Sequence, residues 1–587
     1  MEDKYSWNLT HIFKDENEFE ETVKEIYRMI DVVKSFRGKL AESVDQTYNC
    51  YKSLEYASEL FEKLYGYAML KYHQDMSNQE NAKLYKKVER MATDFAEAES
   101  FVSPELSQIP EERLEEYLQD ERMHEFEKSL RDIIKEKKHI LTQDVEGALA
   151  QYSEVFGASE NVYDIFTNTE FEYDSIKDKD GNELKMSSAL FSRYLSDKDE
   201  SIRKQAFESM YNAYKKHINT ITELYLNRVK YSCITSKLRH YESSLDRATN
   251  NDDSNVKVYE TLVDQMDKHL SLNHDYIALK AKMLGKEQVH MYDVYVNPLD
   301  VDDRKVEYED AKNIVLDALS VMGDEYISTV KEAMDNNWID VYEKENKMSG
   351  GYSMGIYGVH PYILLNYINS PRDVSTLAHE LGHTMHSFYS NRSQNAINAN
   401  YTIMVAEVAS TVNEIILANY LINKEEDKQK KAALINEQLD MIRATLIRQT
   451  MFAEFEKVIH SKIEENQSLT SDNLNEIYYE IVKKYFGSST ICDDEIKYEW
   501  ARIPHFYRCF YVYKYATGIT SAIVIASKIL AGEEGYVEKY INMLSKGGSI
   551  DSLSLLRMVD VDLEKEETYE TAFKYFENKL NQLKNLI

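Results

Sequence analysis

Apolar residues recur at steps of three and four along most of this chain. The longest such runs cover residues 18–33, 54–72, 199–226 and 437–465. Because an α-helix turns every 3.6 residues, this spacing gives each run one apolar face and one polar face. Only 6 Pro and 18 Gly interrupt the 587 residues. The pattern predicts a mainly α protein whose long amphipathic helices bury a sizeable core.

Short stretches with strand-like composition interrupt the helical pattern in a few places. Residues 166–184 contain Asp180-Gly181, a dipeptide typical of a hairpin turn, so this region is predicted to form β-structure. Residues 338–342 and 362–367 are further predicted strands. No linker rich in Pro, Gly or Ser divides the sequence, and no fixed repeat is evident. The least arbitrary division falls near residue 190, which gives an N-terminal helical domain (1–190) and a second domain (191–587).

The segment His379-Glu380-Leu381-Gly382-His383 carries the most informative chemistry in the sequence. Two histidines four residues apart lie on one face of a helix, so both rings can bind one metal ion, and Glu380 can act on a water beside it. Ser370, Pro371 and Asp373 predict the helix start, as N-cap, first helical residue and capping-box partner. The apolar residues lie opposite the histidines; they are Val374, Leu377, Ala378, Leu381, Met385 and Phe388. This arrangement favours a zinc site over a pair of core histidines.

A third protein ligand is expected, because catalytic zinc keeps one position open and takes three ligands from the protein. Glu407 is the candidate, 24 residues after His383. One continuous helix would carry it about 36 Å away, so the chain must turn back within the polar stretch 391–400. Glu414 shares a helical face with Glu407 and is a candidate acceptor for a ligand histidine N–H. His386 lies on the histidine face and is expected to be structural or to support a ligand. The alternative for both glutamates is a solvated helix surface.

A histidine and several tyrosines gather further along the chain. His505, Tyr507, Tyr511 and Tyr515 supply N–H and O–H donors, and the tyrosines are spaced so that one helical face would carry all three. The HExxH arrangement is the core of a zinc peptidase site. Peptide hydrolysis builds negative charge on the former carbonyl oxygen, and fixed donors stabilise that charge. With 45 Tyr in the chain, core or surface positions are the alternative for any one of them.

The charge balance and the cysteines restrict the partners and the compartment. The net charge is −32, from 102 acidic and 70 basic residues, which argues against binding to nucleic acid or to an anionic membrane. The N-terminal residues are polar and lack the apolar core of a signal peptide. The four cysteines are scattered without a CxxC pair, as expected of reduced thiols in the cytoplasm.

These motifs together resemble oligoendopeptidase F, a branch of the thimet-oligopeptidase family of zinc peptidases. The family pattern is HExxH followed about 25 residues later by a glutamate ligand, the place that Glu407 occupies. The other similar segments are residues 7–13, 338–342, 349–353, 502–507 and 510–518. The resemblance implies one zinc ion held by His379, His383 and Glu407. It also implies that His505, with Tyr511 and Tyr515, stabilises the oxyanion.

The predicted function is therefore that of a cytoplasmic zinc endopeptidase acting on short peptides, with Glu380 as the general base. The resemblance further implies two mostly helical halves that enclose a deep substrate channel. An exopeptidase with the same chemistry is one alternative and would need a cation for the substrate carboxylate, for which Arg443, Arg448 and Arg502 are considered. A catalytically silent peptide-binding protein is the other, and the intact Glu380 argues against it. The oligomeric state cannot be read from the sequence.

The stretch 362–367 directly precedes the helix that carries HExxH. As an edge strand it would offer unpaired backbone N–H and C=O groups to an extended peptide substrate. A packed strand without a substrate role is the alternative.

Overall fold

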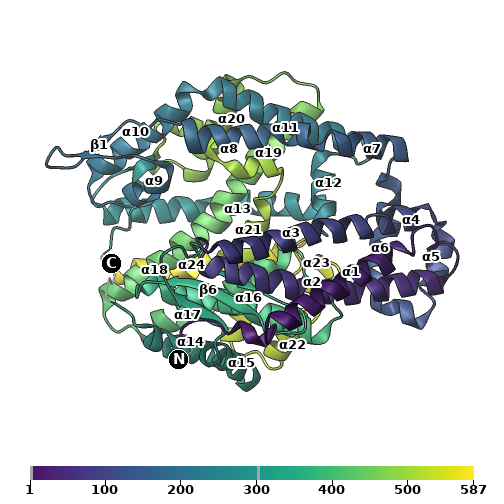
Figure 1. Ribbon diagram of the computed structural model, residues 1–587. Helices are drawn as coiled ribbons and strands as arrows, with labels where there is room; N and C mark the ends of the chain where they lie inside the picture. Colours follow the sequence, from purple (N-terminus) through teal and green to yellow (C-terminus); the bar gives the residue numbers. More distant parts are fainter. Residues whose placement is uncertain (1–3, 300–304) are drawn as a thin grey trace. The chain divides into compact units, whose positions relative to one another are not determined.

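The computed structural model describes residues 4–299 and 305–587 (Figure 1). Two compact units are formed, each from three separate stretches of chain. Unit 1 comprises Met1–Ile140, Asp303–Tyr420 and Ile525–Val561, and unit 2 comprises Leu141–Asp302, Leu421–Val524 and Asp562–Ile587. The predicted division near residue 190 stays a prediction.

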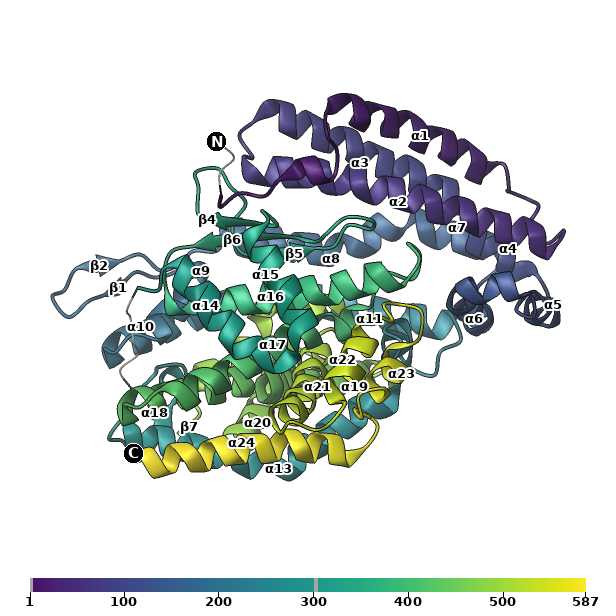
Figure 2. The ribbon, with the colours of Figure 1, turned by 90° about the horizontal axis from the view of Figure 1, so that it is seen from below.

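Unit 1 combines an N-terminal helical bundle with the helices around HExxH. Its helices are α1 (Glu16–Lys34), α2 (Val44–Gln74), α3 (Gln79–Glu99), α4 (Val102–Gln108), α5 (Glu111–Tyr117), α6 (Glu127–Glu136), α14 (Tyr308–Leu319), α15 (Asp324–Asp335), α16 (Pro371–Ser393), most of α17 (Ile403–Lys424), α22 (Tyr536–Leu544) and α23 (Ser552–Arg557). Asp15, Ser43 and Asn78 cap α1, α2 and α3 by accepting backbone N–H groups. These three helices lie alongside one another in both views (Figures 1 and 2).

Unit 1 also contains a small mixed sheet of β4 (Ile339–Tyr342), β5 (Tyr352–Met354) and β6 (Tyr362–Tyr367). The strand order is β4-β6-β5, with β6 parallel to β4 and antiparallel to β5. The predicted strands at 338–342 and 362–367 are confirmed. The expectation that 362–367 forms an edge strand is wrong, because β6 is central and its backbone pairs on both sides. The outer side of β4 contacts the N-terminal segment, because the Val341 N–H of β4 donates a hydrogen bond to the Tyr5 carbonyl. Partly exposed β5 pairs with β6 alone among the described strands.

Unit 2 is built from long helices with two minimal β-ladders. Its helices are α7 (Gln143–Gln151), α8 (Ser153–Ile165), α9 (Ser188–Leu195), α10 (Glu200–Lys216), α11 (Ile218–Leu238), α12 (Ser244–Asn251), α13 (Val256–Met283), α18 (Lys428–Ile442), α19 (Arg448–Glu464), α20 (Ser471–Phe486), the first part of α21 (Tyr513–Leu530) and α24 (Glu566–Leu586). The ladders join β1 (Ile176–Lys177) to β2 (Glu183–Leu184) and β3 (Val289–His290) to β7 (Thr490–Ile491). The β-structure predicted for residues 166–184 is confirmed only for this hairpin, because residues 166–170 continue the helix α8 as the π-helical turn η4 (Phe166–Glu170). Gly181 turns the hairpin with φ +83°, a conformation that glycine adopts without strain.

The mainly α fold with small sheets is confirmed. The run at 199–226 forms two helices, because the chain breaks at His217 between α10 and α11. The run at 437–465 is helical throughout but widens over the turn η7 (Arg443–Ile447) between α18 and α19. Of the described helices, α17 is long and apolar enough to cross a membrane by composition, but 61% of its apolar window is buried inside the protein. It is therefore read as a core helix.

Candidate active site

The helix α16 begins directly after β6, as the sequence pattern predicts. The Asp373 carboxylate accepts the backbone N–H groups of Ser370, at 2.8 Å, and of Ile368, at 3.0 Å. Pro371 occupies the first turn, where its missing N–H costs nothing. The predicted apolar stripe is buried, except for half-buried Phe388. The helix is thus fixed on its apolar side, and its orientation decides where the HExxH side chains point.

The helix α17 crosses α16 at unusually close range, and Gly382 makes this possible. A Cβ atom on Gly382 would lie 2.5 Å from the Ser410 Cα and 2.6 Å from the Ala409 carbonyl oxygen. Asn413 ties the helices together, donating to the Ala378 carbonyl at 3.1 Å, and accepts the Tyr326 hydroxyl at 3.0 Å. The close approach brings the side chain of Glu407 to the two histidines of HExxH.

Three side chains from these helices converge on one point. The Nε2 atoms of His379 and His383 lie 3.2 Å apart, and the Glu407 Oε2 lies 3.5 Å from the first and 3.6 Å from the second. Tetrahedral ligands with bonds of about 2.0–2.1 Å are separated by about 3.3–3.4 Å. The triangle of donor atoms therefore has the size that a four-coordinate metal ion requires. This is the only His, Cys and acidic group of metal-binding geometry found within the described ranges.

The candidate ligands are held by neighbouring polar groups. The Glu414 Oε1 lies 3.3 Å from Nδ1 of His379, so this carboxylate can accept the ring N–H and leave Nε2 free for a metal. The Ser410 hydroxyl donates to the Glu407 carboxylate at 3.3 Å. Interaction with His383 lowers the pKa of Glu407, which keeps this side chain in the charged form that a metal ligand needs.

Glu380 lies on the same helix in a much drier environment. Its side chain is 6% exposed, and burial raises its pKa. Its Oε2 atom has no hydrogen-bond partner among the described residues. Gly351, in the segment after β4, passes so close that a Cβ there would lie 3.4 Å from Oε1 of Glu380. A buried carboxyl with a free oxygen is suited to exchange a proton with a substrate or a water.

His386 is structural in this arrangement. It is fully buried, and its ring stacks on Tyr401 with a centroid distance of 3.5 Å. Burial lowers its pKa to about 3, so the ring is neutral at physiological pH. Tyr401 precedes α17 and its hydroxyl bonds that of Ser387, at 3.0 Å, so the pair fixes the connection between α16 and α17. The sequence pattern gave no signal for Tyr401 or for Asn413, because both act through a partner far away in sequence.

In unit 2, His505, Tyr511 and Tyr515 form a cluster of donors. His505 Nε2 lies 3.4 Å from the Tyr515 hydroxyl, and the ring of Tyr511 lies 5.7 Å from that of His505 and 5.5 Å from that of Tyr515. Burial, followed by the charges of Arg508 and Arg448, lowers the pKa of His505. The imidazole is therefore neutral at pH 7 and can donate an N–H without carrying charge.

The expected single helical face for Tyr507, Tyr511 and Tyr515 is wrong. The short helix η9 (Pro504–Arg508) ends before Tyr511, and α21 begins at Tyr513, with Phe510 between them at φ +60°. Tyr507 is buried and stacks on Tyr163 at 4.4 Å, away from a donor role. The break in the helix explains why only the second and third tyrosines of the series meet His505.

Comparisons with known proteins agree with this geometry. Residues 193–575 match the family described as Peptidase family M3, and residues 105–173 match the N-terminal family described as Oligopeptidase F. The chain belongs to peptidase family M3. It is 38% identical to Oligopeptidase PepF of Bacillus subtilis, over 99% of this chain and 87% of the relative. It is 34% identical to an oligoendopeptidase F homolog of Lactococcus lactis, over 100% and 98%. The crystal structure of oligoendopeptidase-F from Enterococcus faecium superimposes with a TM-score of 0.74 at 30% identity, covering 97% of this chain and 99% of that one.

Membership in family M3 confirms the predicted resemblance and the prediction of a metalloendopeptidase that acts on oligopeptides. The family implies a metal cofactor, and the His379–His383–Glu407 triangle fits one. The three arginines considered for an exopeptidase each lie beside a carboxylate within unit 2. Arg448 pairs with Glu499 at 2.6 Å, Arg502 lies 4.0 Å from the same carboxylate, and Arg443 pairs with Asp440.

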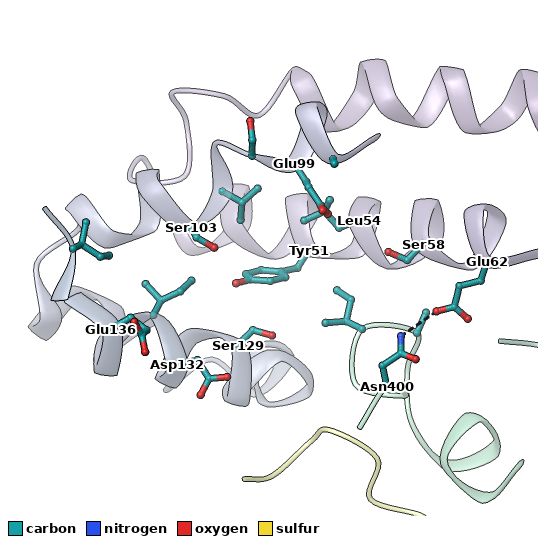
Figure 3. A pocket seen from close by; sticks show the side chains of 17 residues that line it. Tyr51, Leu54, Ser58, Glu62, Glu99, Ser103, Ser129, Asp132, Glu136 and Asn400 are labelled. Carbon is teal, nitrogen blue, oxygen red and sulfur yellow. Dashed lines mark hydrogen bonds between the residues drawn. The ribbon is translucent and has the colours of Figure 1, made fainter. Parts of the chain in front are cut away.

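A pocket of about 660 Å³ in unit 1 of this family M3 chain lies against α2, α3 and α6 (Figure 3). Its polar lining includes Glu62, Glu99, Asp132 and Glu136, with Asn400 donating to the Glu62 carboxylate at 3.1 Å. None of the candidate metal ligands lines this pocket. It is therefore separate from the HExxH site, although Asn400 belongs to the connection between α16 and α17.

Proposed function

We propose that this M3 peptidase binds one zinc ion through His379, His383 and Glu407 and uses it to hydrolyse internal bonds of short peptides. The triangle of donor atoms, 3.2–3.6 Å on a side, carries the proposal. Two imidazoles and one carboxylate are a donor set that suits zinc. When bound, zinc supplies Lewis acidity, which polarises a carbonyl and makes water a better nucleophile.

Glu380 acts as the general base and then as the general acid. Its free Oε2 takes a proton from the attacking water and returns it to the departing amine. Burial favours this exchange, because a desolvated carboxyl has a pKa closer to neutrality than an exposed one. Glu414 holds the ring of His379 in the tautomer that presents Nε2, and Ser410 holds the Glu407 carboxylate.

His505, Tyr511 and Tyr515 are proposed as the donors that stabilise negative charge on the substrate carbonyl oxygen. Their mutual proximity and the neutral state of His505 support this role. Removing one such donor typically lowers the rate by about 10²–10³-fold. The deep substrate channel stays a prediction of the resemblance.

The free side of β5 is proposed as the place where the backbone of an extended peptide pairs. This strand is partly exposed and pairs on one side only among the described strands, and it contacts α16. It therefore takes the role that the sequence pattern assigned to 362–367. A cytoplasmic location is proposed because all four cysteines are free thiols.

Two measurements test the proposal. Glu380→Gln is expected to retain zinc, because Glu380 is not a ligand, and to lower kcat by about 10²–10⁴-fold through loss of proton transfer. Zinc content and kcat on the purified variant check this, and a fully active variant would refute the mechanism. Internally quenched peptides with free or blocked termini, with and without a chelator, separate endopeptidase from exopeptidase action and from a silent binding protein.

A further inference from the structure

A second pocket, of about 280 Å³, lies within unit 2, and cations outnumber anions in its lining. Its walls come from α11, α12 and the junction of η9 with α21. The charged residues that line it are Arg228, Arg247, Arg508, Lys514 and Asp252, and uncharged polar groups come from Ser232, Ser244 and Asn251. In a chain with net charge −32, such a group of cations requires an explanation.

Two of the four cations already have acidic partners. Lys514 pairs with Asp252 at 2.7 Å, and the same carboxylate accepts the Tyr513 hydroxyl at 3.1 Å. Arg508 lies 3.4 Å from Glu160 at the exposed rim. In each pair the carboxylate neutralises its own cation. The charges of the other two arginines, Arg228 and Arg247, are therefore not compensated by these acids.

Arg228 and Arg247 meet no carboxylate among the residues that the structure describes. The Arg228 Nε donates to the Tyr507 carbonyl at 2.6 Å, which fixes the guanidinium plane without neutralising it. Arg247 is half-buried; burial, followed by the charges of Arg239 and Arg228, lowers its pKa. Like charges held together and partly desolvated are unfavourable unless an anion joins them.

We propose that this pocket binds a small oxyanion, held by Arg228 and Arg247 with Ser232 and Asn251 beside them. Guanidinium groups bind carboxylate and phosphate through paired, charge-assisted hydrogen bonds. A pocket of about 280 Å³ is large enough to admit such a group. The carboxylate of a substrate peptide and free phosphate share this chemistry.

The pocket is joined to the donor cluster by chain connectivity. Lys514 lines the pocket, and its ammonium lies 4.6 Å from the ring centroid of Tyr511. Arg508 lines the pocket as well, and its charge acts on His505. An anion bound here would sit beside the segment that carries the proposed oxyanion donors. The peptide-carboxylate source rests on the proposed function, whereas anion binding itself does not.

Thermal unfolding of the metal-free protein tests anion binding without catalysis. Phosphate is added at increasing concentration, with sodium chloride at equal ionic strength as the reference, because salt screens repulsion nonspecifically. Ligand binding to the native state raises Tm. Arg247→Gln is expected to weaken phosphate binding about 10–100-fold, the effect of losing charged hydrogen bonds. Arg193→Gln removes the same charge from an exposed site on α9 and is the matched control.

The same variant separates a binding role from a structural one. Without phosphate, Arg247→Gln is expected to keep or raise Tm, because it relieves repulsion from Arg228 and Arg239. A lower Tm in chloride, or equal stabilisation by phosphate in the wild type and in Arg247→Gln, would overturn the proposal. So would a wild type that phosphate stabilises no more than chloride.

Peptide substrates identify the source of the anion. If the substrate carboxylate occupies the pocket, amidation of the peptide C-terminus raises KM about 10-fold in the zinc-loaded wild type and has little effect in Arg247→Gln. If phosphate stabilises the wild type and amidation changes neither KM, the site is assigned to a free anion. Either result supports the anion site. A failure of anion binding would leave the Glu380→Gln test of the proposed function unaffected.

Discussion

Replacing Gly382 by alanine tests whether the close contact between α16 and α17 positions Glu407 for metal binding. The new Cβ would lie 2.5 Å from the Ser410 Cα, and the atoms it meets belong to backbone. Carbon atoms in contact are normally about 3.5–4.0 Å apart. No side-chain rotation can relieve the clash, so α17 has to move away from α16 by about 1 Å.

The magnitude follows from this displacement. Metal sites tolerate deviations of about 0.2 Å in ligand distances, so a 1 Å shift of α17 takes Glu407 out of bonding range. Overpacking of this kind costs about 1–3 kcal/mol. If that strain opposes the metal-bound geometry, zinc affinity falls by about 5–150-fold at 1.4 kcal/mol per factor of ten. We expect Gly382→Ala to fold with a lowered Tm, to lose zinc to a competing chelator more easily, and to lose kcat/KM in parallel.

The control is Gly157→Ala in α8, where an added Cβ meets nothing within 4 Å. This variant makes the same chemical change in a helix and is expected to keep both zinc and activity. Chelator competition, thermal unfolding and kcat/KM are measured on both proteins. Wild-type zinc affinity in Gly382→Ala would show that Glu407 does not depend on the close helix contact.

Three further predictions follow from individual contacts. Glu414→Ala is expected to lower zinc affinity or activity about 10–100-fold, measured by chelator competition, whereas unchanged values would remove Glu414 from the site. Tyr515→Phe is expected to reduce kcat more than KM, and Tyr513→Phe is expected to spare kcat, since Tyr513 is buried against Asp252; the reverse order in steady-state assays would disprove the donor assignment. Burial raises the pKa of Glu456 to about 8 from its usual 4.5, so its stabilising contribution is full below pH 4.5 and is lost as pH rises to 8. Glu456→Gln should therefore gain stability relative to wild type over that range, by a few kcal/mol at most; a pH-independent difference in unfolding free energy would contradict this.

The HExxH helix was predictable because its signals are local. The cap at Ser370 and Asp373, the apolar stripe and the histidine spacing all lie within one helix and follow from its period. The placement of Glu407 also followed from the sequence, since a ligand 24 residues away requires the chain to turn back. Gly382 was visible as a residue, but its role needs the backbone of α17 as a partner, and periodicity within one helix carries no such information.

The predicted edge position of the strand at 362–367 was wrong for a related reason. The composition of 362–367 predicts a strand and says nothing about its neighbours, because β4 and β5 come from other stretches of chain. A run of buried apolar residues such as Ile363 and Leu364 is nonetheless more typical of a central strand than of an edge. The continuous apolar run at 362–367 therefore favours the packed-strand alternative.

The tyrosine segment shows where helical spacing misleads. Tyr507, Tyr511 and Tyr515 fit one helical face, but the chain leaves the helix between the first two. The Glu456 carboxyl on α19 accepts the Phe510 N–H at 2.9 Å, and Phe510 holds a left-handed conformation that is rare for a bulky residue. A buried acid that stabilises a strained residue is a tertiary contact across about 54 positions of sequence. Phe510 directly precedes Tyr511, so the residue that anchors the break beside the donor cluster, Glu456, belongs to no recognisable motif. The catalytic residues of this chain can therefore be predicted from local motifs, whereas the packing contacts that orient them cannot.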